Sequence, residues 1–433
     1  MQSTPRVVVV GGGLAGLVAA RHLAGGGVNA TLLERTESVG GRVRTLERDD
    51  HRFDRGFQVL FPAYPAVERE LDLEALDLRW FTSGATIARP GRRSVLADPR
   101  QRPGTIPATL LNPEITIGDR LRVARLWWEL RGTDPDRFFD GDDRARDADE
   151  SIERSLLKRG FSAGFIDRFV APFYGGITLD RSLSTSSRVF EYTFRTLAAG
   201  GAAVPAAGMG AIPTQLADRV QAVGGRIETE AAVDAVSSAG SSPTVTTADG
   251  TSYEADAVVV ATDPPAAREL TGVESIPTAA RACVTQYYAL PGDESLETGK
   301  RLLLNAVDDD GPNHVVPHSA VAPEYAPADA TLISATYLGE SETSDSELAR
   351  RTQIALESWY PDRRFDALER AHTDRIPFAQ FDQPPGIHER LPDTRSPDGA
   401  VYLAGDYTRW SSIQGAMRSG RDAAKAVLED LSR

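Results

Sequence analysis

The stretch VVVVGGGLAG at residues 7–16 joins four consecutive valines to a run of glycines. A short, continuously apolar and β-branched run is typical of a buried strand in a parallel sheet. By itself the stretch leaves two interpretations: a buried strand that ends in a tight turn, or the floor of a nucleotide site. The surrounding sequence decides between them.

The neighbouring segments complete a strand–helix–strand unit. Apolar patterning predicts a strand at 6–10, a helix at 14–24 and a second strand at 29–33. Glu34 ends the second strand, 18 residues after Gly16. An acid at this place is positioned to accept hydrogen bonds from ribose hydroxyls, so the unit is typical of dinucleotide binding.

The glycines of this unit match the pattern G-x-G-x-x-G. Gly11 permits the tight turn, Gly13 lets backbone approach a pyrophosphate, and Gly16 lets the helix pack on the strand. The helix begins at Leu14 and Ala15, where free N–H groups and a partial positive charge favour phosphate. The unit predicts a dinucleotide site without distinguishing NAD from FAD, which share the same ADP half.

Two further motifs follow at once. Residues 34–45 read E-R-x(4)-G-G-R-x-x-T, and Asp54 and Gly56 form a D-x-G element within FDRGFQVL at 53–60. In these motifs the sequence resembles the flavin-dependent amine oxidase superfamily, which includes amine oxidases, protoporphyrinogen oxidase and the phytoene desaturases. It is closer to the phytoene desaturase-like members.

This resemblance implies FAD as the cofactor, with the GGR segment crossing its pyrophosphate. Arg42 would make charged hydrogen bonds to phosphate, while Gly40 and Gly41 admit a close backbone turn. The resemblance also places these residues beside the cofactor: Arg35, Gly56, Phe57 and Gln58.

The C-terminal segment 396–433 resembles the family signature AGD…S…GA…SG…AA. A strand at 401–404 is expected to end at Gly405 and Asp406, and Ser411 or Ser412 can cap a helix that runs to about residue 431. By resemblance, Asp406 meets the ribityl-phosphate part of FAD. The first turn of the helix, at Ile413 and Ala416, faces the flavin, where a helix N-terminus stabilises the negative charge of the reduced ring.

A middle segment supplies a third part of the cofactor domain. Strands are expected at 225–236, 244–247 and 255–261, and by resemblance Val233 offers backbone hydrogen bonds to adenine.

The fold class expected from this resemblance is α/β. A Rossmann-like FAD-binding domain of the glutathione reductase type is interleaved with an α+β substrate domain. The boundaries that we expect for the FAD-binding domain are 1–82, 203–272 and 392–433, and those for the substrate domain are 83–202 and 273–391.

The substrate domain carries weaker signals. Candidate residues for the wall of the substrate pocket are Gln58, Tyr174 and Trp410. Amine oxidases of the superfamily place a lysine near flavin N5 on a strand that corresponds to RACVTQYYAL at 281–290, and this segment has no lysine. The departure disfavours a simple amine oxidase.

An arginine-rich helix is expected near residues 117–130, with Leu121, Ala124, Trp127 and Trp128 on one side. We interpret this side as packed on the protein's own core. The alternative is a membrane-facing entrance for a lipophilic substrate.

Composition excludes several classes. The net charge of −14, from 48 basic and 62 acidic residues, disfavours a nucleic-acid partner. The single cysteine, Cys283, and six scattered histidines predict no metal site, although His314 and His318 stand four residues apart. No segment has the length of a membrane span or the pattern of a signal peptide, so we expect a cytoplasmic protein with possible peripheral membrane contact.

These features together predict an FAD-dependent oxidoreductase that takes a hydride equivalent from a C–H bond of a hydrophobic, unsaturated, carotenoid- or isoprenoid-like small molecule. An amine or protoporphyrinogen-type oxidase is the alternative enzyme. A binding protein like the GDP-dissociation inhibitors, without flavin catalysis, is the alternative of another class. The sequence assigns neither catalytic residues nor an electron acceptor.

Overall fold

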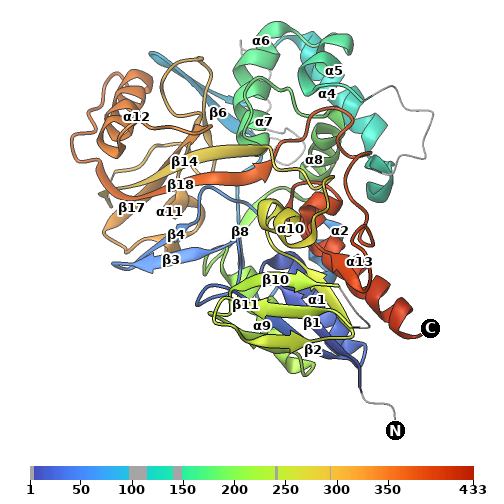
Figure 1. Ribbon diagram of the computed structural model, residues 1–433. Helices are drawn as coiled ribbons and strands as arrows, with labels where there is room; N and C mark the ends of the chain where they lie inside the picture. Colours follow the sequence, from blue (N-terminus) through green and yellow to red (C-terminus); the bar gives the residue numbers. More distant parts are fainter. Residues whose placement is uncertain (1–3, 97–114, 140–148, 239–241, 293) are drawn as a thin grey trace.

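A parallel sheet forms one layer of the molecule (Figure 1). The structure is a computed structural model, and it describes residues 4–96, 115–139, 149–238, 242–292 and 294–433. The strand order of this sheet is β19-β13-β1-β2-β9, and every neighbouring pair is parallel. The strands are β1 (Arg6–Val10), β2 (Asn29–Leu33), β9 (Arg226–Glu228), β13 (Ala257–Val260) and β19 (Val401–Leu403). Three distant parts of the chain therefore build one sheet.

The valine run of β1 serves both faces of this sheet. Val7 and Val9 pack with the helices on one face, whereas Val8 and Val10 pack with the smaller antiparallel sheet on the other. The helices are α1 (Leu14–Gly25), α9 (Ala211–Ala222) and α13 (Ile413–Leu431), and the small sheet contains β10 (Val233–Ser237), β11 (Thr244–Thr247) and β12 (Ser252–Glu254). Both faces are covered, which explains why all four valines are buried.

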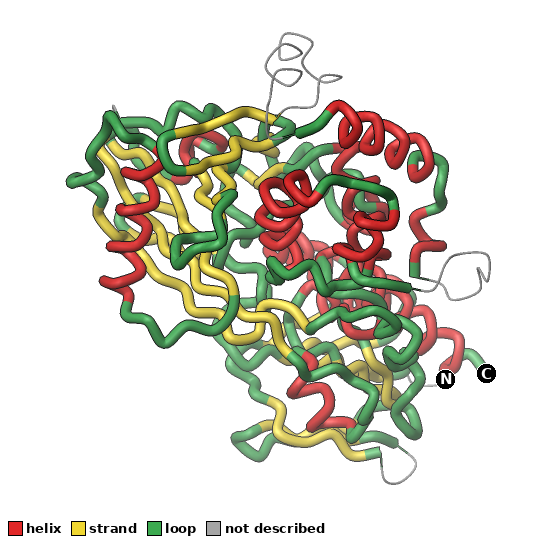
Figure 2. The backbone as a smooth tube through the Cα atoms, turned by 90° about the horizontal axis from the view of Figure 1, so that it is seen from above, coloured by secondary structure: helices red, strands yellow, loops and turns green. Residues whose placement is uncertain are grey.

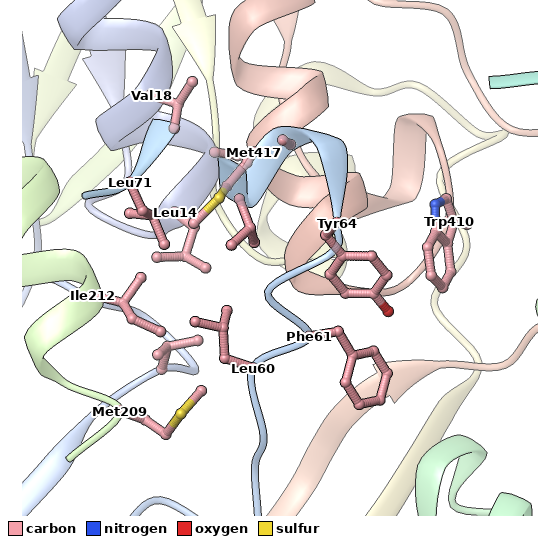
Figure 3. Packing of buried hydrophobic residues seen from close by; sticks show 14 of the residues in the cluster. Leu14, Val18, Leu60, Phe61, Tyr64, Leu71, Met209, Ile212, Trp410 and Met417 are labelled. Carbon is pink, nitrogen blue, oxygen red and sulfur yellow. The ribbon is translucent and has the colours of Figure 1, made fainter. Parts of the chain in front are cut away.

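Helices α1 and α13 approach closely because small residues face each other. A Cβ added at Gly420 would lie 2.1 Å from the carbonyl oxygen of Ala15. Figure 3 shows the core beside this contact, where Leu14, Val18 and Met417 meet the segment that carries Leu60. The C-terminal helix is thereby fixed directly over the first strand–helix turn.

A mixed seven-stranded sheet forms the second layer, with the order β18-β14-β17-β16-β15-β6-β7. Its strands are β6 (Ala85–Arg89), β7 (Arg92–Leu96), β14 (Ala280–Pro291), β15 (Leu303–Asn305), β16 (His314–Val316), β17 (Ala330–Leu338) and β18 (Glu369–Phe381). Helix α12 (Asp345–Trp359) packs on one face of it through Leu356 and Trp359.

A helical group stands beside this second sheet, and Figure 2 shows the long strands on one side and these helices on the other. The group contains α4 (Ile117–Leu130), η2 (Pro135–Phe138), α5 (Ile152–Lys158), α6 (Ala163–Phe165), the π-helix η3 (Ile166–Val170), α7 (Ala171–Thr178) and α8 (Ser187–Gly200). The remaining elements are β3 (Thr45–Arg48), β4 (His51–Asp54), α2 (Pro65–Glu70), β5 (Leu78–Trp80), β8 (Ala203–Pro205), α10 (Pro264–Thr271), α11 (His318–Val321), η4 (Pro323–Tyr325) and η5 (Asp406–Thr408).

The strand expected at 225–236 is wrong as a single element. The chain instead forms β9 in the parallel sheet and β10 in the antiparallel one. Glu230, which lies between them, has a φ of 58°, a left-handed conformation that breaks an extended strand.

The expected orientation of the arginine-rich helix is also wrong. In α4 the buried residues are Asp119, Leu126 and Leu130, while Leu121 is 67% and Trp128 62% exposed. Asp119 faces inward because its carboxylate accepts hydrogen bonds from the Ser162 backbone N–H (2.8 Å) and hydroxyl (2.7 Å). Leu121 and Trp128, which we assigned to the core, are therefore exposed, whereas Trp127 from the same side is half-buried.

Among the described residues, the helices are all too short or too polar to cross a bilayer.

Candidate functional site

One cavity of about 1580 Å³ extends from the carboxyl ends of β1 and β2 into the helical group. It is bordered by all of the predicted cofactor and pocket residues except Gly16: Gly11, Gly13, Leu14, Ala15, Glu34, Arg35, Gly41, Arg42, Gly56, Phe57, Gln58, Tyr174, Val233, Gly405, Asp406, Trp410, Ile413 and Ala416. Ligands of open parallel sheets bind at this edge, so the location fits a nucleotide.

The three glycines of the first turn differ in their surroundings. A Cβ at Gly11, where φ is 108°, would lie 2.8 Å from the Ala261 carbonyl oxygen, and one at Gly16 would lie 1.9 Å from the Gly11 carbonyl oxygen. A Cβ at Gly13 would meet nothing within 4 Å, and Gly13 borders the cavity. Gly11 and Gly16 therefore allow close packing within the protein, and Gly13 leaves open space where α1 begins.

Glu34 is held at the cavity wall by three hydrogen bonds. Its Oε2 accepts from the Gly12 N–H (2.8 Å), and its Oε1 accepts from the Thr36 N–H (3.0 Å) and hydroxyl (2.7 Å). The carboxylate of Glu34 lies 3.8 Å from Arg44, whereas Arg35 is largely exposed and lies 3.7 Å from Asp263. Our sequence interpretation missed Thr36 and Arg44, which fall at unspecified positions of the motif that it quoted.

The GGR turn packs directly on the first glycine turn. The Gly40 N–H donates to the Gly12 carbonyl oxygen (2.8 Å), and a Cβ at Gly41, where φ is 60°, would lie 3.3 Å from the Gly13 Cα. Arg42 follows and places Nη2 2.8 Å from Asp406 Oδ2. The two ends of the chain thus meet at a charged pair on the cavity wall.

Asp406 provides an observation that points to a missing partner. Its Oδ2 accepts from the Ser411 hydroxyl (2.8 Å) as well as from Arg42, but its Oδ1 is buried and has no hydrogen-bond partner within the described part of the chain. A buried carboxylate oxygen without a donor is unfavourable. A ligand hydroxyl at this point would supply the donor.

The N-terminus of α13 opens onto the same wall. The Ser412 hydroxyl caps the helix by accepting from the Gly415 N–H (2.8 Å), and a Cβ at Gly415 would lie 2.0 Å from the Trp410 carbonyl oxygen. Ser412, Ile413 and Ala416 border the cavity. The positive end of a long helix is therefore directed at one part of the cavity.

Asp54 of the D-x-G element and Gln58, which follows it, lie in different surroundings. Gln58 borders the cavity but donates its amide to the carbonyl oxygens of Arg42 (2.8 Å) and Arg55 (3.1 Å), so it holds the loops around it. Asp54 is 1% exposed and does not border the cavity. It accepts from Thr45 (2.6 Å), Met209 N–H (2.8 Å) and Tyr325 (2.7 Å), and burial raises its pKa to about 6.

The part of the cavity within the helical group is apolar and aromatic. Phe161, Phe165, Phe169 and Phe173 border it and form a ladder of stacked rings whose centroids are 5.3, 5.5 and 5.4 Å apart in succession. Trp127 and Trp128 of α4 also border it. Among the described residues from 83–202 and 273–391 that line the cavity, Arg120 is the only charged side chain.

Two of the predicted pocket residues, Trp410 and Tyr174, are buried among aromatic rings. Trp410 is 4% exposed, stacks on Phe139 at 5.0 Å and meets Tyr64 edge-on at 6.0 Å; Figure 3 shows Tyr64 and Trp410 side by side. Tyr174 is likewise 4% exposed and meets Phe190 edge-on at 4.6 Å, and burial raises its pKa.

Our sequence interpretation missed the cavity residues that the second sheet contributes, among them Cys283 on β14 and His314 on β16. Neither has a local motif, because each reaches the cavity through long-range strand pairing. His314 and His318 belong to no group of three potential metal ligands within the described ranges.

Comparison with known proteins gives one family match over most of the chain. Residues 14–428 match the family described as flavin containing amine oxidoreductase. The chain is 42% identical to a carotenoid 3,4-desaturase of Haloarcula japonica over 81 residues, which are 16% of each protein. It is 30% identical to a phytoene dehydrogenase of Streptomyces griseus over 61% of this chain and 56% of that protein. The matches thus span 56% or less of these two relatives.

A longer but weaker match is the 15-cis-phytoene desaturase of Glycine max, which is 23% identical over 98% of this chain and 79% of that protein. Among solved structures, a putative protoporphyrinogen oxidase of Exiguobacterium superposes with a TM-score of 0.72 at 18% identity, covering 99% of this chain and 100% of the other. A putrescine oxidase superposes with a TM-score of 0.72 at 18% identity over 100% of both chains. These structures confirm the expected α/β fold class and its cofactor-domain architecture.

Proposed function

Because the chain belongs to the flavin-containing amine oxidoreductase family and is thus a flavin-dependent oxidoreductase, we propose that its flavin is FAD and that it oxidises an elongated, lipophilic, unsaturated small molecule. The cavity supports both parts of the proposal, since a polar half beside the parallel sheet continues into an aromatic half.

The residues of the polar half suit the successive parts of FAD. We assign Glu34 to the adenosine ribose, the open space at Gly13 to the pyrophosphate, and Arg42 to a phosphate oxygen. Asp406 would receive a hydroxyl of the ribityl chain at its unpartnered Oδ1. Val233 borders the cavity beside these groups and remains our proposal for the adenine contact.

When bound, FAD supplies a two-electron acceptor for a substrate C–H bond. The protein's own contribution is orientation and electrostatics. The N-terminus of α13, capped by Ser412, meets the cavity at Ile413 and Ala416, so the positive end of the helix stabilises negative charge on a group bound there. Tyr64 and Trp410, both 4% exposed, close this region with aromatic rings and exclude water from it.

The phenylalanine ladder carries the assignment of the substrate class. Four stacked rings from Phe161 to Phe173 make a long apolar wall, and Arg120 is the only charged group among the described lining residues of 83–202 and 273–391. A protonated amine would enter this part of the cavity without a carboxylate to pair with. The absence of lysine from 281–290 also argues against the amine oxidase alternative.

A peripheral membrane position follows as part of the proposal. Ile117, Leu121 and Trp128 are 74%, 67% and 62% exposed on α4, and Trp128 also borders the cavity. Arg131 stacks over Trp128 with Cζ 3.2 Å from the ring centroid. An aromatic and aliphatic patch with arginines beside it suits the interface of an anionic bilayer, from which a lipophilic substrate could enter directly.

The first experiment asks whether the purified protein is yellow and whether its released cofactor is FAD rather than FMN. A colourless protein that FAD cannot reconstitute would support the binding-protein alternative. The second experiment mixes the flavin-loaded protein anaerobically with polyenes, amines and a porphyrinogen. We expect the flavin to bleach with a polyene, whereas bleaching with an amine or the porphyrinogen alone would overturn the substrate assignment.

A further inference from the structure

His314 occupies a place in the cavity that the proposed function does not use. It begins β16, is 3% exposed and borders the cavity, and its ring meets that of Phe57 at a centroid distance of 5.2 Å. A Cβ at Gly176 would lie 3.1 Å from its Nδ1, so a glycine provides the room for the ring.

Neighbouring hydrogen bonds fix which ring nitrogen carries the proton. The Asn313 amide nitrogen donates to the Pro172 carbonyl oxygen (2.9 Å), and its amide oxygen accepts from Arg181 (3.3 Å), which sets the orientation of the amide. The same amide nitrogen lies 3.0 Å from His314 Nδ1. Nδ1 must therefore accept, which leaves the proton of a neutral ring on Nε2.

The ring is neutral at ordinary pH because burial lowers the pKa of His314 to about 4. Its Nε2 is buried and has no hydrogen-bond partner among the described residues. Nearby His318 differs, since its Nε2 lies 2.8 Å from the Ser334 hydroxyl. Buried N–H groups without an acceptor are rare and unfavourable, so an acceptor from the occupant of the cavity would complete His314.

We infer that His314 Nε2–H donates a hydrogen bond to an oxygen of the substrate, so that the preferred substrate is an oxygenated unsaturated lipophile rather than a pure hydrocarbon. The inference rests on the proposed function, because it presumes that the aromatic half of the cavity holds the substrate. A site with a buried donor discriminates against an analogue that lacks the acceptor, since binding the analogue leaves the donor unpaired.

The test compares two matched probes, lycopene and its 1-hydroxy-1,2-dihydro derivative, in detergent micelles with the flavin-loaded protein. Binding is followed by the change in flavin fluorescence, and reduction by anaerobic bleaching. We expect the wild-type protein to bind the hydroxylated probe about tenfold more tightly. In His314→Phe, which keeps an aromatic ring of similar size, this preference should disappear while lycopene binds at least as well as before.

Two additional measurements separate a direct hydrogen bond from a structural role. His314→Gln retains an amide N–H and should restore part of the preference, whereas a merely structural role would not distinguish the two probes. The ¹⁵N chemical shifts of the wild-type histidines should include one buried ring protonated at Nε2 and absent from His314→Phe.

Equal binding of the two probes by the wild-type protein, or an unchanged preference in His314→Phe, would overturn the inference and leave the proposed function standing. If neither probe binds or bleaches the flavin, the proposed function fails and the inference fails with it.

Discussion

Arg42 Nη2 lies 2.8 Å from Asp406 Oδ2, and this pair joins the segment after β2 to the segment after β19. The Asp406 side chain is almost fully buried, and both residues border the cavity. The pair therefore joins two motifs from distant parts of the sequence that, by resemblance, belong to neighbouring parts of one cofactor, the pyrophosphate and the ribityl chain.

We expect Arg42→Ala and Asp406→Asn each to weaken FAD binding by roughly ten- to a hundredfold, because each removes a charged hydrogen-bonding group. The flavin-to-protein absorbance ratio after dialysis measures the loss. Arg395→Ala is the matched control, since Arg395 also pairs with an aspartate, Asp430 at 2.9 Å, but lies outside the cavity lining. Full flavin occupancy in both site variants would contradict the assignment.

The glycine turn offers a sharper separation of stability from binding. Gly16→Ala should destabilise the protein by about 3 kcal/mol or more, because its Cβ would lie 1.9 Å from the Gly11 carbonyl oxygen. Gly13→Ala should change stability by less than about 1 kcal/mol, since its φ is −75° and its Cβ meets nothing. Thermal melts of the two apoproteins test this difference.

The same Gly13→Ala variant should nevertheless lose FAD, because the new methyl group occupies the space assigned to the pyrophosphate. Titration of the apoprotein with FAD measures this effect. Wild-type affinity in Gly13→Ala would place the pyrophosphate elsewhere.

Asp54 predicts a pH dependence of stability. Burial raises its folded-state pKa from 3.8 to about 6, so the folded protein binds this proton more tightly than the unfolded chain does. The resulting stabilisation is fully present below about pH 4 and is lost as pH rises through 6, an effect of about 3 kcal/mol. Urea unfolding from pH 4 to 7 should show this loss in the wild-type protein and not in Asp54→Asn, and parallel curves for the two proteins would contradict it.

The exposed side of α4 predicts membrane binding. We expect the wild-type protein to cosediment with vesicles that contain phosphatidylglycerol, and Leu121→Ser/Trp128→Ser to reduce binding about tenfold. Ile354→Ser is the control, because Ile354 is 51% exposed on the distant helix α12. Equal sedimentation of all three proteins would exclude α4 as the contact.

Local signals predicted the cofactor half of the fold well. The strand at 6–10, the helix that begins at Leu14 and the strand at 29–33 all form as expected, because the valine run and the glycine turn act over a few residues. Ser412 caps α13 as one of the two predicted residues. The boundaries at 82, 203, 272 and 392 remain predictions, as do the individual cofactor contacts.

The remaining features depend on contacts that a single segment does not reveal. The face of α4 that carries Asp119 is buried because Ser162 donates two hydrogen bonds to the Asp119 carboxylate. The apolar pattern alone predicted that the opposite face is buried. Glu230 separates β9 from β10 through a left-handed backbone conformation, which a glutamate in the sequence does not predict. His314 reaches the cavity through the pairing of β16 with β15 and β17.

The position of β19 at one edge of the parallel sheet has a consequence for biosynthesis. β1 and β2 leave the ribosome early, but β19, Asp406 and α13 arrive only with residues 401–431. A nascent chain that lacks them has no helix to cover α1 at Ala15 and no Asp406 to pair with Arg42. Capture of the flavin should therefore be a late event in synthesis, and chains that stop early should stay colourless.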